Sequence, residues 1–170
     1  MNPKHILPWT LSAVTLFLSA GAIAAEKGSI VGQWYTEDNQ SKVLIRQDKG
    51  IFTGKIISLD EPLYPKDDKE AGKPKRDREN PDKRRRKAPL VGLKILKDFK
   101  FDASEQSWVD GTIYDPEKGK TYKCVIKFEK DPNVEGGLKL YVRGYVGIPA
   151  LGRTTYWTRV PENELEKVKN

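Results

Sequence analysis

The chain has 170 residues, a length typical of one domain, and 31 Lys and Arg against 24 Asp and Glu give it a formal net charge of +7. One histidine, His5, and one cysteine, Cys124, are too few for the usual zinc and copper sites, and no histidine is present beyond residue 5 to serve as the base of a catalytic triad. These shortages predict a non-enzymatic protein with no metal and no cofactor, although paired carboxylates, a Tyr or a Lys remain available for acid–base chemistry.

The first 25 residues have the layout of a secretory signal peptide. A short polar start precedes an uncharged, mostly apolar run from 6 to 25, and Ala22-Ile23-Ala24 supplies the small-x-small cleavage pattern. We expect cleavage after Ala24 or Ala25 and a mature chain in the bacterial periplasm. The alternative is an uncleaved membrane anchor, because twenty uncharged residues are just long enough to span a bilayer.

Short runs of alternating apolar and polar residues then predict β-strands. The first run extends from 28 to 37, the second from 42 to 47 and the third from 51 to 59. The turn Asp48-Lys49-Gly50 joins the last two runs as a hairpin, with glycine at a position that favours positive φ.

The segment 66–87 interrupts this strand pattern. It holds eleven basic and six acidic residues and no large apolar side chain, so it cannot bury enough surface to offset the entropy of ordering it. We expect an exposed basic loop that contacts anionic envelope lipid or lipopolysaccharide, or a solvated charge run that maintains solubility. Nucleic acid is not an expected partner, because export removes the protein from the cytoplasm and the loop lacks interleaved aromatic residues on which bases could stack. The densest positive charge lies at Lys83, Arg84, Arg85, Arg86 and Lys87.

Strand signals resume at Pro89, and five apolar residues from Val91 to Phe101 share one parity that only Lys97 interrupts. Further strands are predicted at 107–114, 121–129, 138–145 and 153–160, and a polar tail follows from 161 to 170. Eight or nine short strands joined by tight turns predict an all-β antiparallel meander in one domain, 26–160, closed as a barrel or folded as a sandwich.

Two resemblances favour the barrel. The chain contains, in this order, the segments Gly32-Gln33-Trp34, Asn80-Pro81-Asp82, Pro89 to Leu93, Tyr114-Asp115-Pro116, Gly119 to Tyr122, Leu140 to Gly147 and Gly152 to Val160. These segments resemble the bacterial family called domain of unknown function 2147, which implies a small exported protein without an established activity. Trp34, in Gly32-Gln33-Trp34, also resembles the first-strand tryptophan of lipocalin-like barrels, on which an arginine of the last strand packs; Arg153 or Arg159 matches that arginine.

A barrel with these residues suggests a binding module for a small apolar or amphipathic ligand. Aromatic walls with a few polar groups are typical of ligand pockets, although a small barrel can instead be filled by its own side chains. Cys124 shares the parity of apolar neighbours, so we expect it to be buried and unreactive. The residues predicted to contact the ligand are Trp34, Tyr122, Arg143, Tyr145, Arg153 and Trp157.

Overall fold

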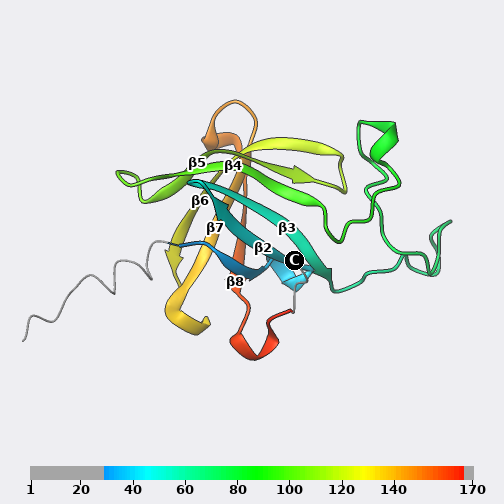
Figure 1. Cartoon of the computed structure of the whole chain (residues 1–170), viewed down its shortest axis with the longest axis horizontal. Helices are drawn as coiled ribbons and strands as arrows, with labels where there is room; N and C mark the ends of the chain where they lie inside the picture. The colour runs from blue at the N-terminus through cyan, green and yellow to red at the C-terminus, as the bar shows by residue number, and fades with distance from the viewer. Residues whose placement is uncertain (1–28, 167–170) are drawn as a thin grey trace, which may run out of the picture.

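The computed structural model describes residues 29–166, so the predicted signal peptide at 1–25 lies outside it. The described chain forms a closed antiparallel barrel in which the strands follow one another around the barrel in chain order (Figure 1). This arrangement confirms the predicted meander and excludes the sandwich. The eight strands are β1 (Gly32–Tyr35), β2 (Ser41–Asp48), β3 (Ile51–Leu59), β4 (Lys94–Asp102), β5 (Ser107–Asp115), β6 (Lys120–Lys130), β7 (Leu138–Tyr145) and β8 (Arg153–Arg159).

Short turns hold neighbouring strands in antiparallel register. The β2–β3 hairpin turns at Lys49 and Gly50, whose φ angles of 48° and 80° are the positive values that the predicted turn requires. Asp48 therefore pairs with Ile51. The helical structure of residues 29–166 consists of short 3-10 turns, among them η2 (Lys83–Arg85) and η4 (Pro149–Leu151). Within residues 29–166, no helix has the length and apolar character needed to cross a bilayer.

The prediction of one uniform parity from Val91 to Phe101 is wrong. Ile95 and Leu96 are consecutive yet both buried, because the register with β3 shifts beside them. Asp98 then takes a positive φ of 64°. Irregularities of this kind change which residues of a strand face inward, and a sequence pattern with period two does not reveal them.

Inward-facing side chains fill the barrel interior. The ring centroid of Trp108, the second residue of β5, lies 5.5 Å from that of Phe128 and 5.9 Å from that of Phe52 in edge-to-face contacts. Cys124 is 2% exposed within this core, which confirms its predicted burial. Other side chains of the same core are Trp34, Val43, Ile45, Ile56, Phe99, Ile126, Leu140, Val142 and Trp157.

The arginine that covers Trp34 is Arg159. Its guanidinium carbon lies 4.3 Å from the indole ring, and its nitrogens donate to the carbonyls of Val31 and Ser29 at 3.2 and 3.3 Å. Arg153, the other candidate, forms an ion pair with Glu37 instead, at 3.1 Å. Since Arg159 pairs in register with Trp34 across the β1–β8 seam, the cation–π contact helps to hold the first and last strands together.

The seam between β1 and β8 is short, with two residue pairs in register. The segment after β8 extends it, because Gln33 exchanges two side-chain hydrogen bonds with the backbone of Glu166, at 2.8 and 2.9 Å. Lys42 also forms an ion pair with Glu166 at 3.1 Å. The described part of the polar tail therefore packs along the outside of β1 and β2.

Candidate functional site

The connection between β3 and β4, residues 60–93, projects from one end of the barrel (Figure 1). It contains the predicted basic segment 66–87, which is largely exposed but has a buried anchor. The Asp77 side chain is 0% exposed and that of Asn80 is 7% exposed. A charged residue is rarely buried without hydrogen-bonding partners, so the surroundings of Asp77 explain how this segment is held.

Asp77 joins the loop to the barrel through its two carboxylate oxygens. Tyr114 of β5 donates its hydroxyl to one oxygen at 2.6 Å, and the Asn80 amide donates to the other at 2.5 Å. Burial, together with the hydrogen bond to Asp77, raises the pKa of Tyr114 well above its ordinary value. Arg86 adds a further contact by donating to the Asn80 carbonyl at 2.7 Å. The hydrogen bond from Tyr114 to the buried Asp77 thus attaches the loop to β5.

The β5–β6 turn packs closely against the same loop. Gly119 has a φ of +62°, and a β-carbon at this position would lie 1.9 Å from the carbonyl oxygen of Glu79. Only glycine allows the two backbones to approach this closely. The loop therefore packs against Tyr114 of β5 and against Gly119 of the β5–β6 turn, in addition to the backbone hydrogen bonds that Gly92 and Leu93 form with Ile56 of β3.

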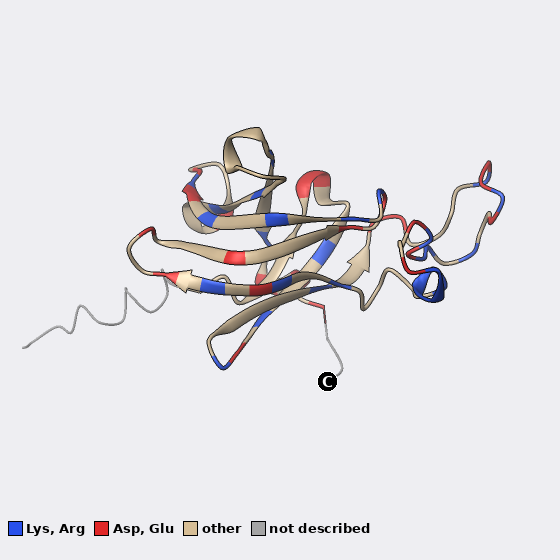
Figure 2. Ribbon diagram, turned by 90° about the horizontal axis from the view of Figure 1, so that it is seen from above, with Lys and Arg blue, Asp and Glu red and all other residues tan. Residues whose placement is uncertain are grey.

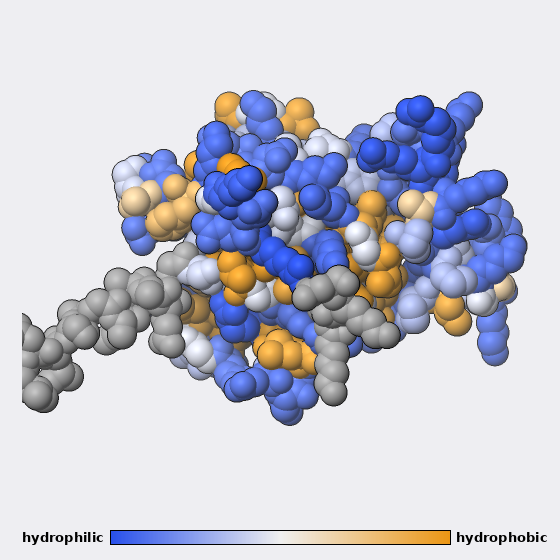
Figure 3. All heavy atoms as spheres, in the orientation of Figure 1, coloured by the Kyte–Doolittle hydropathy of each residue, from blue (hydrophilic) through white to orange (hydrophobic). Residues whose placement is uncertain are grey.

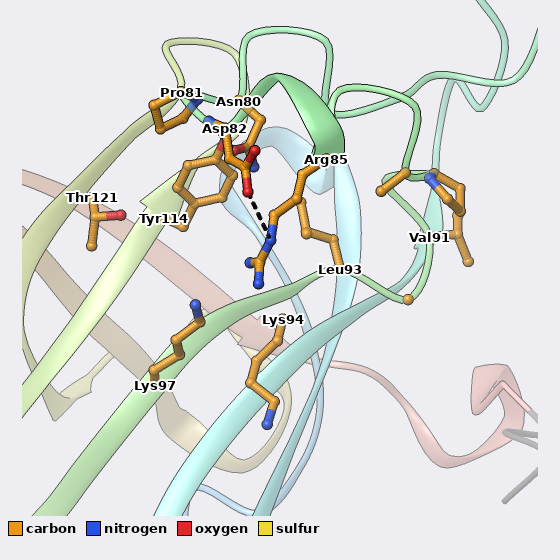
Figure 4. A pocket seen from close by; sticks show the side chains of 13 residues that line it. Asn80, Pro81, Asp82, Arg85, Val91, Leu93, Lys94, Lys97, Tyr114 and Thr121 are labelled. Atoms are coloured by element: carbon orange, nitrogen blue, oxygen red, sulfur yellow. Dashed lines mark hydrogen bonds and ion pairs between the residues drawn. The ribbon is translucent and has the colours of Figure 1, made fainter.

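Between the loop and the barrel wall lies a cleft of about 640 Å³ (Figure 4). Lys97 follows Leu96, which packs into the core, so on β4 the floor of the cleft is the outer surface of the barrel. Tyr114 also lines the cleft and is itself partly buried against the core. The cleft is lined by Asn80, Pro81, Asp82, Arg85, Ala88, Pro89, Val91, Gly92, Leu93, Lys94, Lys97, Tyr114 and Thr121.

Positive charge dominates the cleft. Figure 4 shows Arg85 reaching down from the loop and Lys97 reaching up from β4 toward the same space. Arg85 lies 3.9 Å from Asp82, a carboxylate that already binds Arg84 at 3.0 Å. Within residues 29–166, neither Lys94 nor Lys97 has an ion-pair partner. The cleft therefore offers uncompensated cations beside the apolar side chains of its lining.

The six residues predicted to contact a ligand do not surround one cavity. Trp34 and Trp157 are 1% and 2% exposed and belong to the packed core. Tyr122, the third residue of β6, is partly buried and lies next to Gly144 of β7. Trp34 and Trp157 therefore pack against other core side chains rather than around an open cavity.

The other three predicted contact residues lie away from the core. Arg143 and Tyr145 alternate with the inward-facing residues of β7, which places them on the outer surface. Arg143 donates to the carbonyls of Pro149 and Ala150, at 2.6 and 3.0 Å. Arg153 is exposed and pairs with Glu37, as described above.

The predicted anionic-surface residues, Lys83 to Lys87, form the exposed turn η2 and its flanks at the outer part of the loop (Figure 2). Asp82 caps this turn by accepting a hydrogen bond from the backbone of Arg84 at 3.0 Å. Within the described chain, Lys83 and Lys87 have no ion-pair partner. The basic run therefore combines residues that stabilise the loop with lysines that remain available to solvent.

Sequence reasoning missed Lys94, Lys97, Tyr114 and the other wall residues of the cleft. The signal that could have found them is the set of segments that carry the family resemblance, because four of these segments contribute to the cleft: Asn80-Pro81-Asp82, Pro89 to Leu93, Tyr114-Asp115-Pro116 and Gly119 to Tyr122.

Comparisons with known proteins agree with this fold. No curated protein matches the chain. Among solved structures, protein HP1028 from the human pathogen Helicobacter pylori, which belongs to the lipocalin family, is similar with a TM-score of 0.64 and 22% identity. The similarity covers 84% of this chain and 93% of that chain, so the barrel has a lipocalin-like fold. A family model described as "uncharacterized protein conserved in bacteria (DUF2147)" matches residues 32–159, and the chain belongs to this family.

Proposed function

We propose that the protein is a non-enzymatic binding module for a small amphipathic ligand that carries an anionic group. The observation that carries this proposal is the cleft beside β4, where Lys94 and Lys97 are unpaired and Arg85 is only weakly compensated. Ammonium and guanidinium groups bind carboxylates and phosphates through charge-assisted hydrogen bonds. Val91 and Leu93, on the same lining, offer contacts to an apolar portion of the ligand.

The size and shape of the cleft suit a small molecule. Its volume of about 640 Å³ lies within the range of roughly 300–1,000 Å³ that is usual for small-ligand sites. We place the site on the outer wall because the barrel interior is packed with its own side chains. Trp34, Trp108 and Phe99 are each 1% exposed. The lipocalin-like fold is compatible with a binding role and does not itself locate the ligand.

We further propose that the mature protein works in the periplasm. The layout of residues 1–25 supports export, with a charged start, an apolar run and small residues at the cleavage point. A periplasmic protein meets amphipathic anions such as fatty acids and phospholipid fragments, whose chemistry matches the cleft. N-terminal sequencing of the protein from a periplasmic fraction tests this, and a start at Met1 in the membrane fraction would contradict it.

Ligand binding can be tested with dodecyl phosphate as the probe, measured by isothermal titration calorimetry. We expect one molecule to bind per chain, and dodecyl maltoside, which has a neutral head group, to bind more weakly. The K94Q/K97Q variant should lose about tenfold or more in affinity, because a hydrogen bond to a charged group contributes about 1.5–3 kcal/mol. The control K100Q/K130Q makes the same change of charge at residues that do not line the cleft.

Equal affinity of K94Q/K97Q and the unmodified protein would overturn the cleft as the binding site. Native mass spectrometry of the protein purified from the periplasm complements the titration, because a natural ligand would appear as an added mass that the K94Q/K97Q variant lacks. A natural ligand that is retained by this variant would place the site elsewhere.

The second candidate function is contact with an anionic envelope surface through η2. The observation that favours it is the exposure of Lys83, Arg84 and Lys87 on the outer part of the loop; the Arg84 side chain is 90% exposed. Adhesion to anionic vesicles should weaken as salt increases. It should weaken in K83Q/R84Q/K87Q, which leaves the Arg86 contact to Asn80 in place. Unchanged adhesion of this variant would exclude the candidate.

A further inference from the structure

The loop between β7 and β8, residues 146–152, carries the three most exposed large apolar side chains of the described chain. Val146, Ile148 and Leu151 are 72%, 58% and 80% exposed, the three highest values among the exposed large hydrophobic residues of 29–166. Figure 3 shows apolar side chains at the upper edge of the molecule, where Figure 1 draws this loop. Clustered exposure of this kind marks an interaction site more often than an isolated apolar residue does.

The loop is held in place by polar contacts. Arg143 of β7 donates its Nε to the Pro149 carbonyl at 2.6 Å, its Nη2 to the Ala150 carbonyl at 3.0 Å and its Nη1 to the Thr154 hydroxyl at 2.7 Å. A β-carbon at Gly152 would lie 2.6 Å from the Gly144 carbonyl oxygen, so the base of the loop is closely packed. The exposed aliphatic side chains are therefore presented on an ordered turn.

Cations and aromatic rings lie next to this turn on the outer barrel surface. Lys123 is exposed and pairs in register with Tyr145, the last residue of β7. Lys127 is also exposed, and its ammonium lies 4.6 Å from the Tyr141 ring centroid. Glu105 is the acidic residue of the shallow hollow that the turn shares with this surface. Positive charge thus predominates around the apolar turn.

We propose that residues 146–152 dock the protein on an anionic lipid membrane. In this arrangement Val146, Ile148 and Leu151 enter the boundary between head groups and acyl chains, and Lys123 and Lys127 contact lipid phosphates. Apolar side chains above a base of tyrosines and lysines match the polarity gradient of a membrane interface. A stable protein partner would need roughly 800 Å² on each side, which a turn of seven residues does not offer alone.

The test measures binding to vesicles of phosphatidylcholine and phosphatidylglycerol by flotation, at low salt and at about 0.5 M salt, where surface charges are largely screened. The V146S/I148S/L151S variant should lose about a hundredfold in partitioning, since three partly exposed aliphatic side chains no longer enter the bilayer. The control L63S/L165S removes exposed leucines elsewhere and should bind as the unmodified protein does. Vesicles of phosphatidylcholine alone should bind more weakly.

Several results would overturn the proposal. One is equal vesicle binding by V146S/I148S/L151S and the unmodified protein, and another is the absence of vesicle binding by the unmodified protein. A third is a dimer in light scattering that this variant abolishes, which would assign the turn to a second copy of the chain. Dodecyl phosphate binding by the variant should stay unchanged, which keeps this test separate from that of the cleft.

Discussion

Replacing Tyr114 with phenylalanine removes the hydroxyl that joins the basic loop to the barrel and leaves the volume of the ring unchanged. One oxygen of Asp77 then loses the 2.6 Å hydrogen bond from Tyr114, while the Asn80 amide still donates to the other oxygen. Asp77 is 0% exposed, so water does not readily replace the lost donor. Hydrogen bonds to charged groups contribute about 1.5–3 kcal/mol, and the free energy of unfolding should fall by about that amount.

Thermal unfolding followed by tryptophan fluorescence measures this effect. A loss of 1.5–3 kcal/mol should lower Tm by about 4–10 °C in a domain of this size. The control Y145F removes a hydroxyl on the outer surface, for which the described chain offers no hydrogen-bond partner, and should change Tm by less than about 2 °C. A Y114F variant as stable as the unmodified protein would refute the role of the Asp77 contact.

The pH dependence of the same variant gives a second test. Because the pKa of Tyr114 is higher in the folded chain than the ordinary value of about 10, its protonated form is favoured by folding. The stabilisation is complete below pH ~10 and is lost as the pH rises through the folded-state pKa. The difference in stability between Y114F and the unmodified protein should therefore be constant from about pH 6 to 9 and should shrink above about pH 10.

Three further predictions concern the core, a turn and the seam. Burial raises the pKa of the Cys124 thiol to about 12, so a thiol reagent at pH 8 should label the protein only after it unfolds. G119A should lower the free energy of unfolding by more than G50A, because both residues have positive φ but only Gly119 lies against backbone; equal effects in urea titrations would contradict the close approach. R159Q removes the cation 4.3 Å from the Trp34 ring and should cost about 1–2 kcal/mol in the same titrations; an unchanged midpoint would exclude a stabilising role for this contact.

The barrel was predictable from sequence because it depends on local alternation. The β2–β3 hairpin and the inward residues of β6, including Cys124 and Ile126, follow directly from period-two patterning and from glycine at the turn. β4 departs from the prediction at Ile95 and Leu96, since a register shift depends on how β4 pairs with β3. The register between two strands that are distant in the chain cannot be read from the sequence of either strand alone.

The cleft could not be predicted in the same way. The acidic residue Asp77 sits in a strongly charged segment, and its composition indicates solvent exposure; its burial depends on Tyr114, which is 37 residues away. In the sequence, Lys94 looks like an ordinary outward residue and Lys97 only interrupts the apolar parity of its segment, so neither indicates a site before the loop is placed beside them. The predicted ligand contacts Trp34 and Trp157 failed to line a pocket for a related reason, because parity predicts which residues face inward and not how much space remains between them.

Closure of the barrel depends on the last residues of the chain. A nascent polypeptide that still lacks β8 and the segment up to Glu166 leaves β1 with one open hydrogen-bonding edge and Gln33 without its backbone partner. An open strand edge is a template for pairing with another chain, so a chain that lacks β8 should associate with other molecules through β1.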